Sequence, residues 1–162
     1  GAMLSMLGIS LLNEIVAGIP GDSASPAVIM EYLREKLMSS LGQNPEKYEP
    51  GEGFNKDGID MGLVLFDFDG MTAHYAGGCR PLWIVREGEV IKYKADRIPI
   101  GMFFGEYKGF RDNIIELKHG DMVYMFSDGI IDQFGYVDDE RKTIKHFSSQ
   151  RLAQLLLSVY DS

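Results

Sequence analysis

The chain has 162 residues, of which 45% are hydrophobic and 11% aromatic, and this composition predicts one compact domain with a sizeable core. A net charge of -8 and scattered basic residues argue against nucleic acid as the main partner, because phosphate binding needs clustered Lys and Arg. The single cysteine, Cys79, excludes an internal disulfide, and no apolar run reaches membrane-spanning length. We therefore expect a cytoplasmic location, or the cytoplasmic part of a larger protein.

Two helices are predicted near the start of the chain. Residues 2–16 are apolar on nearly every face, which predicts a helix buried on most sides; its expected core residues are Met3, Met6, Leu7 and Leu11. A second helix is expected after the N-cap Ser25 and to about residue 41. Its apolar residues recur every four positions and predict one buried face.

Three hairpins are predicted between residues 61 and 127. The pairs are 61–68 with 71–76, 81–86 with 89–94, and 112–118 with 121–127. Irregular connections are expected over 42–58 and 135–147, and Ser148 or Ser149 can cap a last helix. This order predicts an α+β fold of helices packed on largely antiparallel sheets.

One carboxylate is predicted at the end of the strand 121–127, where the sequence reads Ser127-Asp128-Gly129. A hard divalent cation prefers oxygen ligands, and a glycine beside the carboxylate allows backbone and solvent to approach the ion. The same three residues also form a common turn, and one carboxylate cannot hold such an ion alone. These residues by themselves leave both interpretations open.

Four separated blocks resemble the SpoIIE/RsbU-like branch of the metal-dependent PPM serine/threonine phosphatases. They are SMLGISLLNEIV, KDGIDMGLVLFD, AGGCRPLWIVREGEVIKYKADRIPIG and GDMVYMFSDGIIDQFG, in family order and over nearly the whole chain. The resemblance implies a layered α-β-β-α sandwich in which two Mn²⁺ or Mg²⁺ ions activate a water to attack phosphoserine or phosphothreonine. It also implies that Asp128 is a metal ligand, and it suggests a bacterial signalling phosphoprotein of the anti-anti-sigma type as the substrate.

Two parts of the family pattern are absent from this sequence. The first metal aspartate precedes a Gly-His-Gly turn in the family, and the last lies in an Asp-Asp or Asp-Asn pair before a final strand. Asp138-Asp139 does not replace that pair, because Arg141 and Lys142 follow it. We expect residues 1–162 to be a single partial phosphatase domain, truncated at both ends, with weak metal binding and little hydrolysis. Exposed strand edges would then favour a homodimer.

Other polar residues have simpler interpretations. Asp57 and Asp60 suit turns or caps, and we do not expect Asp132 or Gln133 to be ligands. The three histidines, His74, His119 and His146, are too dispersed in the sequence to predict a zinc site.

Cys79 could be a reactive thiol, and two arginines could bind a phosphate. Arg80 could lower the thiol pKa of its neighbour Cys79, but the sequence implies no histidine base beside it, so we expect no nucleophile. Arg80 and Arg97 could meet a phosphate, although surface ion pairing is the usual role of arginine. Trp83, at a strand centre, is expected in the core.

Two other classes of function remain open. A non-catalytic interaction or regulatory module with a degenerate phosphatase fold would keep the hydrophobic pattern while losing metal carboxylates. A β-rich ligand-binding domain of unrelated ancestry would instead have a closed apolar pocket with no carboxylate at its strand ends.

Overall fold

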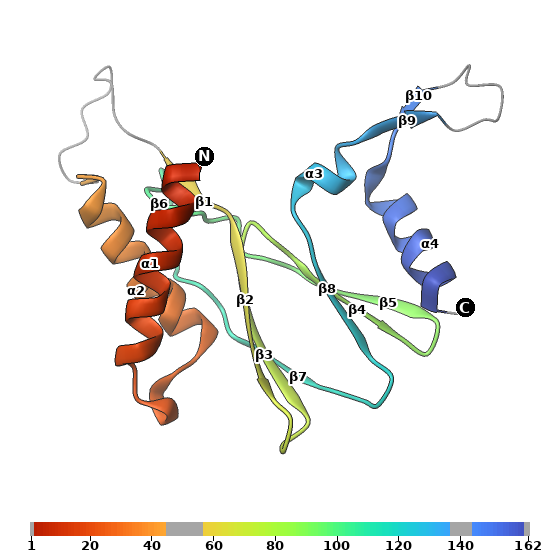
Figure 1. Cartoon of the computed structure of the whole chain (residues 1–162), viewed down its shortest axis with the longest axis horizontal. Helices are drawn as coiled ribbons and strands as arrows, with labels where there is room; N and C mark the ends of the chain where they lie inside the picture. The colour runs from red at the N-terminus through yellow and green to blue at the C-terminus, as the bar shows by residue number, and fades with distance from the viewer. Residues whose placement is uncertain (1, 45–56, 137–143, 161–162) are drawn as a thin grey trace. The chain divides into compact units, whose positions relative to one another are not determined.

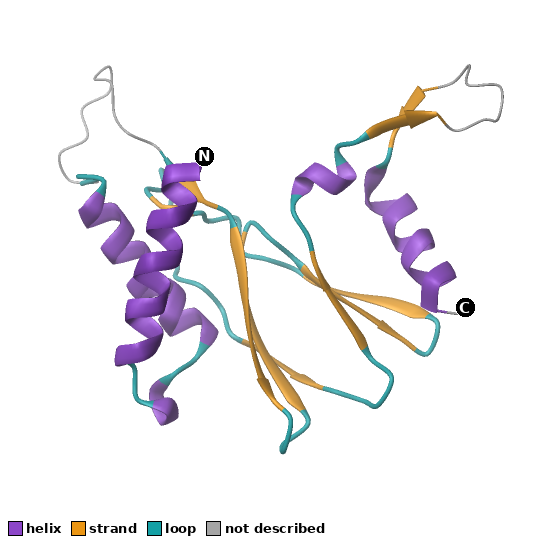
Figure 2. Ribbon diagram, in the orientation of Figure 1, coloured by secondary structure: helices purple, strands orange, loops and turns teal. Residues whose placement is uncertain are grey.

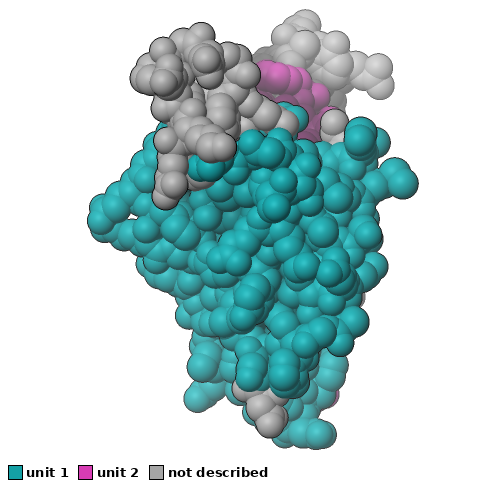
Figure 3. Space-filling model, turned by 90° about the vertical axis from the view of Figure 1, so that its left-hand side faces the viewer, with its two compact units in different colours: residues 1–80, 94–117 teal, residues 81–93, 118–162 magenta. Residues whose placement is uncertain are grey.

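The computed structural model describes residues 2–44, 57–136 and 144–160 (Figure 1). The chain divides into two compact units (Figure 3): unit 1 comprises residues 1–80 and 94–117, and unit 2 comprises residues 81–93 and 118–162. That residues 1–162 form a single partial domain stays a prediction.

The described residues of unit 1 form two helices, a 3₁₀ turn and five strands. In chain order they are α1 (Ala2–Gly18), the 3₁₀ turn (Gly21–Ser23), α2 (Pro26–Ser40), β1 (Gly58–Ile59), β2 (Met61–Asp67), β3 (Thr72–Gly78), β6 (Ile100–Gly101) and β7 (Asn113–Glu116). Unit 2 contains β4 (Leu82–Arg86), β5 (Glu89–Tyr93), β8 (Met122–Met125), α3 (Asp128–Ile131), β9 (Phe134–Tyr136), β10 (Ile144–His146) and α4 (Ser148–Tyr160).

Helix α2 is the centre of the unit 1 core. The Ser25 hydroxyl accepts a hydrogen bond from the Val28 N–H at 3.3 Å, and Pro26 is the first helical residue, as predicted. At the same end, the Ala27 N–H donates to Asp112 Oδ1 at 2.9 Å. Of the apolar residues expected on its buried face, Tyr32 is 49% exposed, but the other four are buried; they are Ile29, Met30, Leu33 and Leu37. These residues form one cluster with Ala76, Ile98 and Ile100.

Helix α1 is where the burial prediction is wrong. It packs on α2 along one side, where Leu7 and Leu11 contact the core and Ile15 is buried. Met3 and Met6, however, are 87% and 72% exposed. An apolar sequence predicts a helix but not what covers it, and nothing in the described residues covers this side of α1.

The sheet of unit 1 has the strand order β2-β3-β7, and both pairs are antiparallel (Figure 2). The predicted hairpin of β2 and β3 is confirmed, with Met61 opposite Gly78 and Asp67 opposite Thr72. Its turn is closed by Asp67 Oδ1, which accepts from the N–H groups of Asp69 and Gly70 at 3.1 and 2.9 Å.

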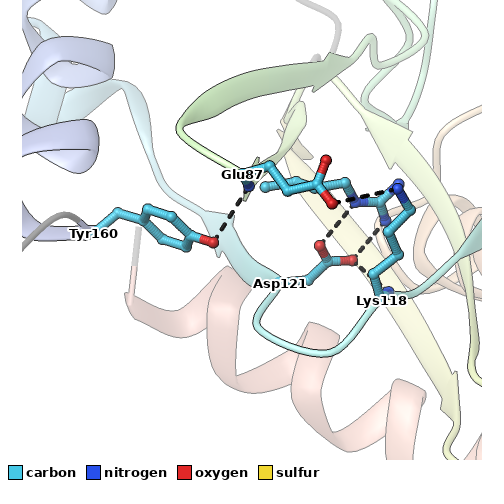
Figure 4. A network of polar contacts seen from close by, with 5 residues as sticks. Glu87, Lys118, Asp121 and Tyr160 are labelled. Carbon is cyan, nitrogen blue, oxygen red and sulfur yellow. Dashed lines mark hydrogen bonds and ion pairs between the residues drawn. The ribbon is translucent and has the colours of Figure 1, made fainter.

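The sheet of unit 2 has the order β5-β4-β8, also antiparallel. The β4–β5 hairpin is confirmed, and so is the core position of Trp83, which is 4% exposed. At the far end of this sheet, Arg86 forms a two-point ion pair with Asp121, at 2.8 Å from Nε and 2.5 Å from Nη2 (Figure 4). The Tyr160 hydroxyl of α4 accepts the Glu87 N–H at 3.2 Å beside it.

The third predicted hairpin is wrong. Strand β7 pairs with β3 in unit 1, whereas β8 pairs with β4 in unit 2, so the turn at His119-Gly120 joins strands of two different sheets. The backbone of residues 118–121 is closed like a hairpin turn, because the Asp121 N–H donates to the Lys118 carbonyl at 3.1 Å. Short-range turn signals do not state which strand an apolar segment will pair with.

The connection predicted over 135–147 also differs from the structure. Strands β9 and β10 occupy both of its ends and pair antiparallel, with Tyr136 opposite Ile144 and Phe134 opposite His146. The Asp138-Asp139 pair and most of the 42–58 connection lie outside the described residues. None of the described helices has the length and apolarity that a membrane span requires.

Candidate metal-binding site

Asp128 lies at the point where the sheet of unit 2 gives way to a short helix. Strand β8 is held on β4 from Met122, opposite Val85, to Met125, opposite Leu82. The next residue, Phe126, packs edge-on against Trp83 with ring centroids 4.8 Å apart. Helix α3 then begins at Asp128, whose side chain is exposed. The strand end is therefore fixed by packing, and it presents this carboxylate to solvent.

Asp132, one helical turn further on, is the nearest acidic neighbour in sequence. Its N–H donates to the Asp128 carbonyl at 2.8 Å, which closes the turn. Its carboxylate lies 3.3 Å from His146 Nε2, and the His146 ring meets Phe134 edge-on at 5.2 Å. Asp132 thus contacts the β9–β10 hairpin, a role that the sequence did not predict because β10 was not recognised as a strand.

The described residues do not fit a two-metal centre. Within residues 2–44, 57–136 and 144–160, no three His, Cys, Asp or Glu side chains gather into a group that could hold a metal ion. Mg²⁺ requires about six oxygen ligands in octahedral geometry, and one exposed carboxylate supplies at most two. We therefore assign no catalytic step to a metal from these residues, and Asp128 as a ligand stays a prediction.

Unit 1 brings Asp60, Cys79 and Arg80 together at the end of β3. Arg80 Nη2 lies 3.0 Å from Asp60 Oδ2, so Asp60 is in an ion pair and not only a turn residue. Burial, and then the Asp60 charge and hydrogen bond, raise the pKa of the Cys79 thiol to about 11. Arg80 opposes this shift but does not outweigh it, which agrees with our expectation that Cys79 is not a nucleophile.

The raised pKa predicts that the Cys79 thiol is alkylated slowly. At pH 8 we expect Cys79 to react with iodoacetamide about tenfold or more slowly than free cysteine, because little thiolate is present, although a more basic thiolate is more nucleophilic. The rate should rise with pH up to about 11, and Asp60→Asn should increase it at pH 8. The chain in urea is the control and should react like free cysteine; equal rates in the folded and unfolded chain would contradict the prediction.

Comparison with known proteins identifies the family. The family model described as Stage II sporulation protein E (SpoIIE) matches residues 2–162. The chain belongs to the SpoIIE family. Within this family its fold, helices with antiparallel sheets, is that of PP2C-type phosphatase domains, which confirms the predicted α+β class. No curated protein matches the chain significantly.

Several solved structures are similar to the chain, among them two PP2C domains. The SiaA-PP2C domain of Pseudomonas aeruginosa is 24% identical with a TM-score of 0.74, and the match covers 96% of this chain and 54% of that one. The PP2C phosphatase domain of SpoIIE from Bacillus subtilis, solved with a fragment of its regulatory domain, is 23% identical with a TM-score of 0.57; the match covers 94% of this chain and 43% of that one. The SpoIIE-family chain thus spans about half the length of the solved structures it matches.

Proposed function

We propose that the protein to which this SpoIIE-family chain belongs is a metal-dependent phosphoserine/phosphothreonine protein phosphatase of bacterial signalling. Its substrate would be a phosphoprotein, of the anti-anti-sigma type by analogy with the family, and its location the cytoplasm or the cytoplasmic part of a larger signalling protein. The family match over residues 2–162 carries this proposal.

Within that function, the proposed role of Asp128 is to supply one ligand for Mn²⁺ or Mg²⁺. Its support is the position of an exposed carboxylate at the end of β8, in the Ser-Asp-Gly motif where the family has a metal-binding aspartate. Because the described residues contain no group of three metal-binding side chains, we propose that the 162-residue chain alone binds metal weakly and hydrolyses little or no phosphoester. A homodimer through exposed edges also stays a prediction.

Calorimetric titration of Mn²⁺ into the 162-residue chain, beside a phosphoester hydrolysis assay, tests the weak-binding part. We expect a Kd of about 1 mM or weaker, typical of the weakest oxygen-ligand sites, and turnover no faster than buffer. Tight binding with manganese-dependent turnover would refute it and would mean that the chain completes a site, for example by pairing with a second copy.

The role of Asp128 is tested in a chain extended to the length of the solved PP2C domains. There Asp128→Asn should lower kcat/KM by about 100-fold or more, because changes even to groups that only support a metal ligand cost 10–100-fold. Asp132→Asn, which removes the same charge one turn away, is the matched control and should change kcat/KM less than about threefold. An extended chain that folds, binds no Mn²⁺ and has no activity would instead favour the non-catalytic interaction module.

A further inference from the structure

A charged pocket of about 370 Å³ lies in unit 1, in the segment between β5 and β7. Three cationic side chains line it, from Arg97, Lys108 and Arg111, together with the carboxylates of Asp96 and Glu106. Ile98, which is buried, and Phe103, which packs against the core, supply an apolar part of its wall. Its volume is within the range of pockets that hold small ligands or single side chains.

The wall of this pocket is fixed to β3 at one end. The Asp96 N–H donates to the Gly77 carbonyl at 2.8 Å, and the Cys79 N–H donates to the Asp96 carbonyl at 2.7 Å. These two bonds extend the edge of the strand into the segment that carries Arg97. The backbone directly before Arg97 is therefore hydrogen-bonded to β3 in the way that one strand pairs with another.

The other end of the segment is fixed to helix α2. Glu31 accepts hydrogen bonds from the Phe110 N–H at 2.9 Å and from the Tyr107 hydroxyl. The Arg34 guanidinium lies 3.9 Å from the centre of the Tyr107 ring and donates to the Gly101 carbonyl at 3.0 Å. Tyr107 and Phe110, which flank Lys108 in sequence, are thus tied to α2 by side-chain contacts.

Hydrogen-bond donors outnumber acceptors on this pocket. Both Asp96 oxygens are engaged by Arg111, one by Nε at 2.7 Å and one by the backbone N–H at 2.9 Å. This leaves the two terminal amino groups of Arg111 without an acceptor among the described residues. Lys108 pairs with Glu106 at 3.1 Å, but both side chains are highly exposed, so that pair is weak.

Arg97 is the most available of the three cations. Its side chain is exposed, and in the described part of the chain it makes no hydrogen bond or ion pair. A guanidinium carries five N–H donors in a planar fork that matches two oxygens of a phosphate or carboxylate. The chain as a whole has a net charge of -8, so its general field repels anions, and binding of an anion here needs local contacts of this kind.

We propose that this pocket, lined by Arg97, Lys108 and Arg111, binds an oxyanion of the phosphate class. The anion is either free inorganic phosphate or a phosphorylated side chain of a protein partner, whose neighbouring apolar atoms would contact Ile98 and Phe103. The site goes beyond the proposed phosphatase activity, because it uses no metal and none of its lining residues is Asp128.

Titration of sodium phosphate into the ¹⁵N-labelled 162-residue chain tests this site by NMR. EDTA is present, and NaCl keeps the ionic strength constant because exposed charges are screened by salt. We expect saturable shifts of the amides in 96–98 and 108–111, with a Kd of about 1–10 mM, as for a few exposed charged hydrogen bonds. Arg97→Gln should weaken binding about fivefold or more, and Lys108→Gln should weaken it in the same direction.

Lys94→Gln is the matched control, because it removes an exposed positive charge in the same segment without lining the pocket. It should change the Kd less than about twofold. No saturable shift, or equal weakening by Arg97→Gln and Lys94→Gln, would overturn the site. A retained amide spectrum shows that each variant is folded, so a lost shift reports on binding.

A phosphoserine peptide and its unphosphorylated form distinguish the two sources of the anion. Binding of the phosphopeptide about tenfold more tightly than phosphate would support a protein partner, and equal affinity would support free phosphate. Equal binding of both peptides would overturn the oxyanion site. Because EDTA is present and no turnover is measured, failure here is independent of failure of the phosphatase proposal.

Discussion

Asp121→Ala is expected to lower the free energy of unfolding by about 2–4 kcal/mol, because removing one partner of a fully buried ion pair costs about 3–5 kcal/mol and this pair is largely, not fully, buried. The Asp121 and Arg86 side chains are only 5% and 16% exposed, and the carboxylate also accepts the Lys118 N–H at 2.8 Å. The variant would leave the guanidinium desolvated without this carboxylate. Urea unfolding followed by circular dichroism measures the loss.

The same pair predicts a dependence on pH. Hydrogen bonds from Arg86 hold the pKa of the Asp121 carboxyl below its usual range, despite the opposing effect of burial. A lowered pKa in the folded state means that the pair stabilises the fold above about pH 4, the pKa of an unfolded Asp, and that this stabilisation is lost as the pH falls. Between pH 6 and 3 the original chain should therefore lose more stability than Asp121→Asn.

Two further variants test whether the loss in Asp121→Ala comes from its ion pair with Arg86. The exposed pair of Lys36 with Glu14, at a similar 2.8 Å, is the matched control, and Glu14→Ala should cost less than about 0.5 kcal/mol. The double variant Arg86→Met with Asp121→Leu should be more stable than Asp121→Ala, because it leaves no buried charge. In a cycle with the single variants Arg86→Met and Asp121→Leu, additive losses would show that the two side chains are not coupled.

Gly77→Ala is expected to destabilise the chain by about 3 kcal/mol or more, through overpacking and a broken buried hydrogen bond. Tyr75 is fully buried, and its hydroxyl donates to the Arg80 carbonyl at 2.5 Å. A Cβ at position 77 would lie 2.5 Å from that same carbonyl oxygen and would overlap the tyrosine hydroxyl. The backbone would have to move, and urea unfolding followed by circular dichroism measures the resulting loss in the free energy of unfolding.

Gly18→Ala is the control for this substitution, because a Cβ at that helix end meets no atom within 4 Å. It should be neutral or slightly stabilising, since alanine favours helix over glycine by roughly 0.5–1 kcal/mol. Tyr75→Phe should cost about 1 kcal/mol, the net value of one hydrogen bond. If Gly77→Ala were no more harmful than Gly18→Ala, the close approach of residues 75, 77 and 80 would be wrong.

The α+β class was predictable because it depends on local patterns, and the family was predictable from the resemblance of four sequence blocks. Helix α2 has a cap, a proline and a four-residue apolar period, and all three act within a few residues of chain. The hairpins β2–β3 and β4–β5 have turn residues between apolar strands, which also act locally. The strand and the glycine beside Asp128 were also local signals, but its expected role as a metal ligand came from the family resemblance and stays a prediction.

The missed features depend on contacts between distant residues. Which strands β7 and β8 pair with, and whether Met3 and Met6 are buried, depends on which other segment packs against each apolar surface. The hydrophobic pattern within one segment does not indicate that other segment. The ion pair of Arg86 with Asp121 joins residues 35 positions apart in sequence. No spacing rule indicates such a pair, because it depends on the register of β4 with β8.

The sequence by itself determined the long helices and two of the three predicted hairpins, because periodicity, caps and turns are short-range effects, and the resemblance of four sequence blocks gave the family and one candidate metal carboxylate. Only the tertiary structure decided that 119–120 joins two sheets, that burial and Asp60 outweigh Arg80 at the Cys79 thiol, and that three cations share one pocket. Strand pairing, desolvation and clustered charge all act between segments that are close only after folding.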